Sequence, residues 1–320
     1  MWGLFIGIVI FLLALDLGVL HRKAKEIGVR ESLLMSAFYM TMGLCFGIWV
    51  WYSLGAQSGK EYFTGFLVEK TLAMDNIFVI SLIFQYFAIP RMYQHRVLFW
   101  GILGVIVLRA IMISLGATLV SEFSWVLYIF AVFLIFTGIK MLYIGDHVPD
   151  IENNPVLKFM RRNMRITNEL HGEKFTVKLP DPQSGNKLVR WYTPLAIALI
   201  LIEIVDLVFA VDSVPAIFAI TTDPYIVYTS NIFAILGLRA MYFALAAIIH
   251  RFKYLKPALA IVLIFIGSKI FISWFMGWEK FPATLSLAIT IGILASGIFY
   301  SLYRTRVGSA EGGNTPPAAS

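Results

Sequence analysis

The chain contains little cysteine and little histidine. Cys45 is the single cysteine among 320 residues, and it lies in an apolar run. One thiol excludes a disulfide within the chain and a metal site built from several thiolates. The histidines fall in predicted loops or at helix ends, which gives no support to a histidine-based zinc site: His21, His95, His147, His171 and His250. Gly-rich phosphate loops, nucleophile elbows and zinc-protease motifs are missing too, so we expect neither an enzyme nor a bound cofactor.

Charged residues are also scarce, at 14 % of the chain, whereas hydrophobic residues make up 59 %. Apolar runs of roughly 20 residues, long enough to cross ~30 Å of hydrocarbon, recur along nearly the whole chain. We therefore predict an all-α polytopic membrane protein with nine transmembrane helices, the first retained rather than removed as a signal peptide. The predicted spans are residues 3–20, 33–54, 65–87, 97–119, 124–144, 193–218, 228–249, 257–276 and 283–303.

Lysine and arginine predict how the chain lies in the membrane. Alternate loops, 55–64, 120–123, 219–227 and 277–282, hold only Lys60 and Lys280, while most of the other basic residues lie in the remaining loops and the tail. By the positive-inside rule the amino terminus is outside and the carboxyl terminus is cytoplasmic. The net charge of +7 is then cytoplasmic-loop charge, so we expect the lipid bilayer as a partner and no nucleic acid.

The segment 145–192 is predicted to be a cytoplasmic loop with structure of its own. Residues 154–165, NPVLKFMRRNMR, have the pattern of an interfacial amphipathic helix. Residues 172–191 then read as a short β-hairpin with a Pro-Asp-Pro and Ser-Gly turn. The tail, residues 304–320, is low in complexity, and we expect it to be disordered.

Two helix-length apolar stretches carry acidic residues, FLVEKTLAMDNIFVISLIF (66–84) and LIEIVDLVFAVDSVPAIF (201–218). An ionised carboxylate inside a bilayer costs at least ~2.5–3.5 kcal/mol on insertion scales, so these residues need a reason. The stretches match each other. Glu69 and Asp75 are six residues apart in the first, as Asp206 and Asp212 are in the second.

The match continues along the chain as an internal repeat. ILGVIVLRAIMI (102–113) corresponds to IFAILGLRAMYF (232–243), and FLIFTGIKML (133–142) corresponds to VLIFIGSKIF (262–271). We predict two inverted three-helix repeats, a common design in secondary transporters. The chain then divides into two first helices (1–64), repeat 1 (65–144), the cytoplasmic loop (145–192), repeat 2 (193–276), a ninth helix (277–303) and the tail (304–320).

The intramembrane acids are hard oxygen donors, and carboxylates with carbonyls and water suit Mn²⁺, Ca²⁺ or Mg²⁺. We predict a metal site from Glu69, Asp75, Glu203, Asp206 and Asp212, with weaker candidates in Asn76, Ser213 and Asp16. On a regular helix Asp212 points half away from Glu203, and a helix broken at Pro215 would turn it inward.

The alternative for these acids is structural charge pairing inside the bilayer. The candidate partners are Arg109, Lys140, Arg239 and Lys269, with Lys70 free to reach toward the outer interface. Counting Asp16, six acids face these four cations. About two negative charges are therefore left over, and one divalent cation would neutralise them.

Three strings closely resemble the TerC/Alx family of integral membrane proteins: LVEKTLAMDNIFV (67–79), EIVDLVFAVDSVPAIFAITTDP (203–224) and TSNIFAILGLRAMYF (229–243). The resemblance implies a nine-helix bacterial inner-membrane protein, with the five acids at the family's intramembrane acidic positions. It also implies an association with tellurite resistance and, for the Alx branch, manganese export.

Two functions follow from the acids and the resemblance. The first is export of a hard divalent cation, foremost Mn²⁺, by proton antiport through the carboxylates. The second is a scaffold or assembly factor for other membrane or metal-dependent proteins, as some relatives resemble. A scaffold has no use for five acids in the bilayer, which favours the exporter; tellurite resistance would be indirect in both cases.

Overall fold

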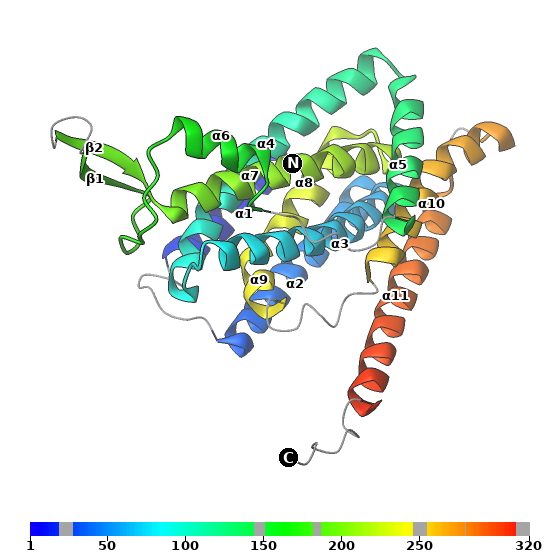
Figure 1. Cartoon of the computed structure of the whole chain (residues 1–320). Coiled ribbons are helices and arrows are strands. Elements are labelled where there is room, and N and C mark those ends of the chain that lie inside the picture. The colour runs from blue at the N-terminus through cyan, green and yellow to red at the C-terminus, as the bar shows by residue number, and fades with distance from the viewer. Residues whose placement is uncertain (19–27, 144–150, 182–186, 246–254, 279, 312–320) are drawn as a thin grey trace.

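The computed structural model describes residues 1–18, 28–143, 151–181, 187–245, 255–278 and 280–311 of the chain. The fold is an all-α helical bundle with one small hairpin at its side (Figure 1). In chain order the helices and strands are α1 (Trp2–Gly18), α2 (Val29–Leu54), α3 (Ala56–Tyr86), α4 (Arg91–Glu122), α5 (Val126–Tyr143), α6 (Pro155–Asn163), β1 (Thr176–Asp181), β2 (Lys187–Tyr192), α7 (Pro194–Ile220), α8 (Pro224–Ile235), α9 (Leu238–Leu245), α10 (Leu255–Met276) and α11 (Ala283–Glu311).

Seven stretches of the described chain are long and apolar enough to cross a membrane, in α2, α4, α5, α7, α8 with α9, α10 and α11. The other two predicted spans correspond to α1, which is shorter, and α3, whose apolar stretch is interrupted by charged residues. The protein is thus a multi-pass membrane protein, and nine spans remain a prediction. The unit α8–α9 lies at the centre, because 94 % of its apolar window is buried, against at most 50 % for the other six.

Three predicted boundaries are corrected by the structure. The predicted outer loop 55–64 shrinks to Gly55, whose φ of 94° ends α2 and lets α3 begin at Ala56. The predicted single span 228–249 is broken between α8 and α9 by Gly237, whose φ is 82°. The ninth helix continues beyond 303 to Glu311, into the segment expected to be disordered. Residues 312–320 lie outside the described part.

The two features predicted for the loop 145–192 are confirmed. Helix α6 begins after Asn154, which caps it by accepting from the Val156 amide, and strands β1 and β2 pair antiparallel. The apolar side of α6 does not lie against lipid, however, because Leu157 and Met160 are buried in the same core as residues of α3, α4 and α7.

Loops predicted to share one side of the membrane lie together. Residues from all four predicted outer loops, or from the helix ends beside them, line one cavity. At the other end, Arg96 of α4 forms an ion pair with Glu173 of the loop 145–192 at 2.7 Å, and Arg161 of α6 donates to the Tyr86 hydroxyl of α3. The grouping agrees with the predicted topology; which end faces the cytoplasm stays a prediction from the lysine and arginine distribution.

Helices α5 and α10, the predicted third helices of the two repeats, make a reciprocal contact. A Cβ on Gly138 would lie 2.7 Å from the Ala260 carbonyl, and a Cβ on Gly267 would lie 2.6 Å from the Ala131 carbonyl. Gly138 corresponds to Gly267 in the aligned repeat strings, and the same offset of 129 residues relates Ala131 to Ala260 just before them, so the same contact is made twice. Such close approach of small residues is a usual way to pack membrane helices. It supports the repeat for this helix pair, and the inversion of the whole repeat stays a prediction.

Candidate functional site

Arg109, near the middle of α4, is the centre of a buried polar site. Its side chain is only 2 % exposed, and its guanidinium group reaches carboxylates of two other helices. Nη1 donates to Oε1 of Glu69 on α3. Nη2 and Nε donate to the two carboxylate oxygens of Asp206 on α7, at 3.1 and 3.3 Å. This two-pronged geometry is the strong form of an arginine–carboxylate pair. Arg109 thus pairs with two of the intramembrane acids, Glu69 and Asp206.

Three neutral side chains complete the site. Arg109 Nη1 also donates to Ser213 Oγ at 3.1 Å and to Asn231 Oδ1 at 3.5 Å. Asn76 donates from Nδ2 to Asp206 Oδ1 at 3.0 Å. We call these six residues the Arg109 cluster: Glu69 and Asn76 of α3, Arg109 of α4, Asp206 and Ser213 of α7, and Asn231 of α8. All six are buried.

The helical repeat explains which acids enter the cluster. Glu69 and Asn76 are seven residues apart, as are Asp206 and Ser213, and seven residues are almost two full turns, so each pair lies on one helix face. The two pairs are also equivalent in the aligned repeats, since Asn76 follows Asp75 as Ser213 follows Asp212. The cluster is therefore built from matching positions of the two acidic helices.

Asp212 is one residue short of that face and points elsewhere. Its carboxylate is half-buried and accepts a hydrogen bond from the Thr137 hydroxyl of α5 at 3.2 Å, and the charge of Lys140 acts on it from the same helix. The expected break at Pro215 is wrong, because α7 runs without interruption from Pro194 to Ile220. The structure therefore does not bring Asp212 to Glu69 and Asp206.

Glu203 lies one turn before Asp206 and packs against α4. A Cβ on Gly104 would overlap its carboxylate, so glycine is required for this approach. Glu203 Oε2 is buried and has no hydrogen-bond donor among the described residues, and the same is true of Asn76 Oδ1. A void of about 10 Å³ lies beside Asn76, Gly101 and Asp206, which is close to the space of one water molecule. The unsatisfied oxygen of Asn76 thus belongs to a residue that lines a small gap at the edge of the cluster, and the unsatisfied oxygen of Glu203 lies one helical turn from Asp206.

The remaining predicted basic residues lie outside the cluster. Lys269 is buried on α10 and donates to Ser286 Oγ of α11 at 3.3 Å. Arg239 is buried on α9, close enough to His95 for their charges to interact. Lys70 does not reach outward: it is buried and donates to the Ala234 carbonyl of α8 at 3.0 Å.

Two predicted acids cannot be placed by their side chains. Asp75 lies in α3 and Asp16 in α1, and both side chains lie outside the described ones. Within the described part, no group of three or more Asp, Glu, His and Cys side chains is close enough to hold one metal ion. In this conformation the positive charge between Glu69 and Asp206 is that of Arg109.

Asn231 is the member of the cluster that the sequence analysis missed. The signal was present, because Thr229, Ser230 and Asn231 are three consecutive polar residues within an apolar span. All three are fully buried, and the two hydroxyls satisfy themselves by donating to backbone carbonyls of their own helix. Only the Asn231 side chain reaches across to another helix.

Comparison with known proteins agrees with these features. Residues 54–309 match the integral membrane protein TerC family. The chain is 53 % identical to an "Uncharacterized membrane protein" of Rickettsia bellii (strain RML369-C), covering 96 % of this chain and 98 % of that protein. It is 43 % identical to the "Putative membrane-bound redox modulator Alx" of Escherichia coli (strain K12), covering 92 % of this chain and 91 % of that one. No solved structure matches. The chain belongs to the TerC family of integral membrane proteins.

Proposed function

We propose that this protein exports a hard divalent cation, foremost Mn²⁺, from the cytoplasm through the Arg109 cluster. The observation that carries the proposal is the convergence of Glu69 and Asp206, from two different helices, deep inside an apolar bundle. Intramembrane carboxylates that face a bundle interior are typical of ion pathways. The neutral members of the cluster add amide and hydroxyl oxygens, and sulfur and imidazole are missing from it, which suits Mn²⁺, Mg²⁺ or Ca²⁺.

In this proposal Arg109 is a counter-cation that the transported ion displaces. Its guanidinium group pairs with both Glu69 and Asp206 when the site carries no cargo. A divalent ion entering beside Asp206 would take over these carboxylates, and Arg109 would turn away because two cations cannot share one position. Asn76, whose Oδ1 is unsatisfied, lines the small void beside Asp206 where the ion would enter.

Coupling to protons follows from the same groups. A carboxylate that binds either a proton or a metal ion moves the two in opposite directions when the site opens alternately to each side. We propose that Glu203, whose Oε2 lacks a donor, carries the proton. Efflux should then fail when a protonophore collapses the proton gradient, and efflux that ignores both the protonophore and external pH would contradict the antiport.

The second candidate is a scaffold for other membrane proteins. Here the carboxylates serve only to pair Arg109, and the ion pairs hold the three helices α3, α4 and α7 together. The redox role named for the relative in Escherichia coli has a limited basis in this chain, since one cysteine cannot form an internal dithiol couple. Substitution of these carboxylates distinguishes the exporter from the scaffold.

Manganese efflux from loaded cells, divided by the amount of protein in the membrane, is the deciding measurement. Asp206→Asn and Glu69→Gln keep size and most hydrogen bonding but remove a charged ligand, so each should lose efflux per molecule. Glu122→Gln, an exposed carboxylate at the end of α4, is the matched control and should export normally. If Asp206→Asn and Glu69→Gln merely lower abundance and keep normal efflux per molecule, the scaffold is the better explanation.

A further inference from the structure

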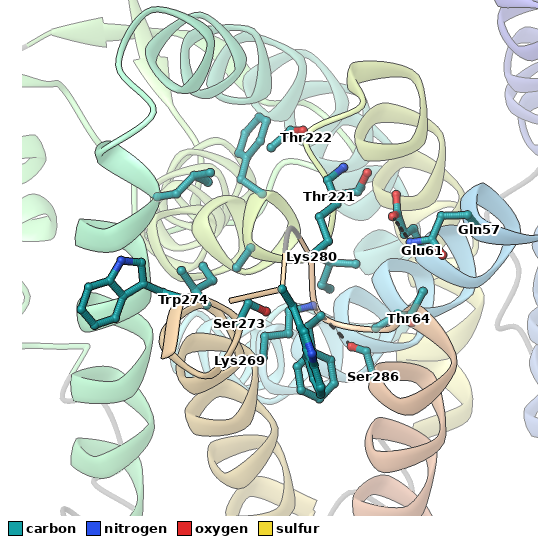
Figure 2. Close-up of a pocket in the computed structure, with 18 of the residues that line it drawn as sticks. Gln57, Glu61, Thr64, Thr221, Thr222, Lys269, Ser273, Trp274, Lys280 and Ser286 are labelled. Carbon is teal, nitrogen blue, oxygen red and sulfur yellow. Dashed lines mark hydrogen bonds between the residues drawn. The ribbon is translucent and has the colours of Figure 1, made fainter. Parts of the chain in front are cut away.

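The cavity at the predicted outer end of the bundle has no role in the cation path proposed above. Its volume is about 370 Å³, and it lies among the ends of α3, α5, α7 and α10 and the start of α11 (Figure 2). Among the described residues, those that line it with charged side chains are Glu61, Lys269 and Lys280. We call it the outer chamber.

Lys269 is the most unusual residue of the outer chamber, because it is a lysine only 5 % exposed. Burying an ammonium group is costly unless hydrogen bonds and an opposite charge compensate it. The Lys269 ammonium donates to Ser286 Oγ at 3.3 Å, and no carboxylate among the described residues lies within 4 Å of it. Glu61 faces the same chamber and accepts a hydrogen bond from Gln57 at 2.7 Å. Glu279 lies outside the described residues.

Two further groups of the chamber are unsatisfied or electropositive. Ser273 lies one turn after Lys269 on α10; it is 8 % exposed, and its Oγ has no partner among the described residues. Ala283 and Ser286, in the first turn of α11, also line the chamber. The Ser286 amide donates to the Pro282 carbonyl, so the amide N–H groups of this turn that lack a helical partner are those before Ser286, including that of Ala283. Figure 2 shows Lys269, Ser273 and Ser286 around one part of the cavity.

We propose that the outer chamber binds a phosphate group, held by the Lys269 ammonium, the Ser273 hydroxyl and the amino end of α11. Among the described lining residues two ammonium groups face one carboxylate, and this balance favours an anion. The phosphate comes either from free inorganic phosphate or from the headgroup of an anionic phospholipid. Trp274 lines the chamber and is 72 % exposed, and Phe275 beside it is 85 % exposed, so the chamber lies next to an apolar surface that suits acyl chains. This proposal does not depend on the export function.

The test is the thermal stability of the full chain, purified in detergent and titrated with inorganic phosphate. A ligand that binds only the folded state raises the melting temperature in a saturable way. In a second arm, nanodiscs of phosphatidylglycerol are compared with nanodiscs of phosphatidylcholine in phosphate-free buffer. Stabilisation by inorganic phosphate identifies a free anion as the ligand, and stabilisation by phosphatidylglycerol alone identifies a lipid headgroup; each result supports the proposal.

Three variants make the test specific. Lys269→Met should abolish the stabilisation, and Ser273→Ala should weaken the apparent affinity by roughly 10-fold or more, as expected for one hydrogen bond to a charged group. Lys60→Met removes another lysine at the same end, one that donates to Thr284 and does not line the chamber, and should respond like the unmodified protein.

Several results would overturn the proposal. The proposal is wrong if neither phosphate nor phosphatidylglycerol stabilises the unmodified chain. It is also wrong if Lys269→Met responds to them as the unmodified chain does. If Lys269→Met does not accumulate, Ser273→Ala decides alone, and an unchanged affinity refutes the site. If Lys269 serves only to balance the charge of Glu61, then Glu61→Gln should destabilise the protein as much as Lys269→Met does. Phosphate should then have no effect on any variant.

Discussion

Replacing Arg109 by glutamine tests whether the cluster is held by charge pairing. Arg109 is fully buried and pairs with two carboxylates that are themselves buried. Removing one partner of a buried ion pair costs about 3–5 kcal/mol, because the remaining charge stays in a low-dielectric site without compensation. Arg96→Gln, on the same helix, is the matched control. Its ion pair with Glu173 has side chains 40 % and 33 % exposed, and such surface pairs contribute about 0–1 kcal/mol.

The assay is the folded fraction after heating of detergent-extracted protein, followed by size-exclusion chromatography of a fluorescent fusion. Arg109→Gln should lose most of its folded peak at temperatures where Arg96→Gln keeps it. Adding Glu69→Gln and Asp206→Asn to Arg109→Gln should restore part of the loss, because the stranded carboxylates are then neutral. If Arg109→Gln is as stable as Arg96→Gln, or if the triple variant is less stable than the single one, the charge-pairing account is wrong.

Two further predictions concern glycines, and Gly292→Ala on α11 is the control for both, since nothing lies within 4 Å of the added Cβ. Gly104→Ala should leave stability nearly unchanged but lower manganese efflux per molecule, because the new Cβ pushes aside only the end of the Glu203 side chain; normal efflux would argue against a role for Glu203. Gly138→Ala and Gly267→Ala should each destabilise the protein by about 1–3 kcal/mol, because each added Cβ meets a backbone carbonyl. A clear difference between these last two melting temperatures would contradict the reciprocal contact of α5 and α10.

The acidic residues could be found from the sequence, but their partners could not. Charge inside an apolar run is visible without a structure, and so is the match between the two acidic helices. Which face of α7 meets which neighbour depends on packing, and this decides that Asp206 joins Arg109 while Asp212 turns to Thr137 of α5. The six-residue spacing that made the repeat visible in the sequence does not keep two side chains on one helix face, whereas seven residues are almost two full turns and do. Asp212 therefore lies off the face that carries Asp206 and Ser213.

The positions of the helix breaks could not be predicted from the sequence either. Pro215 was expected to interrupt its helix, yet α7 continues through it, since proline removes only one backbone hydrogen bond and membrane helices tolerate this. The break falls instead at Gly237, in a stretch that reads as one apolar span. Nothing in the sequence distinguishes this glycine from the other 23 of the chain as the one that ends α8 with a left-handed φ, and its close contact with Tyr39 is visible only in the structure.

This break explains why the two equivalent arginines differ. Val107 in the first copy corresponds to Gly237 in the second, so a continuous α4 carries Arg109 into the cluster, whereas the broken helix carries Arg239 to α9. Gly237→Val would make the second copy like the first. We expect it to lose most of its folded protein, because φ is 82° and a Cβ would lie 2.5 Å from the Tyr39 Cβ. Val107→Gly, the reciprocal change, leaves a helix that costs less than about 1 kcal/mol more to form. Equal membrane abundance of the two variants would show that the break is not fixed by Gly237, and that the asymmetry of the arginines has another origin.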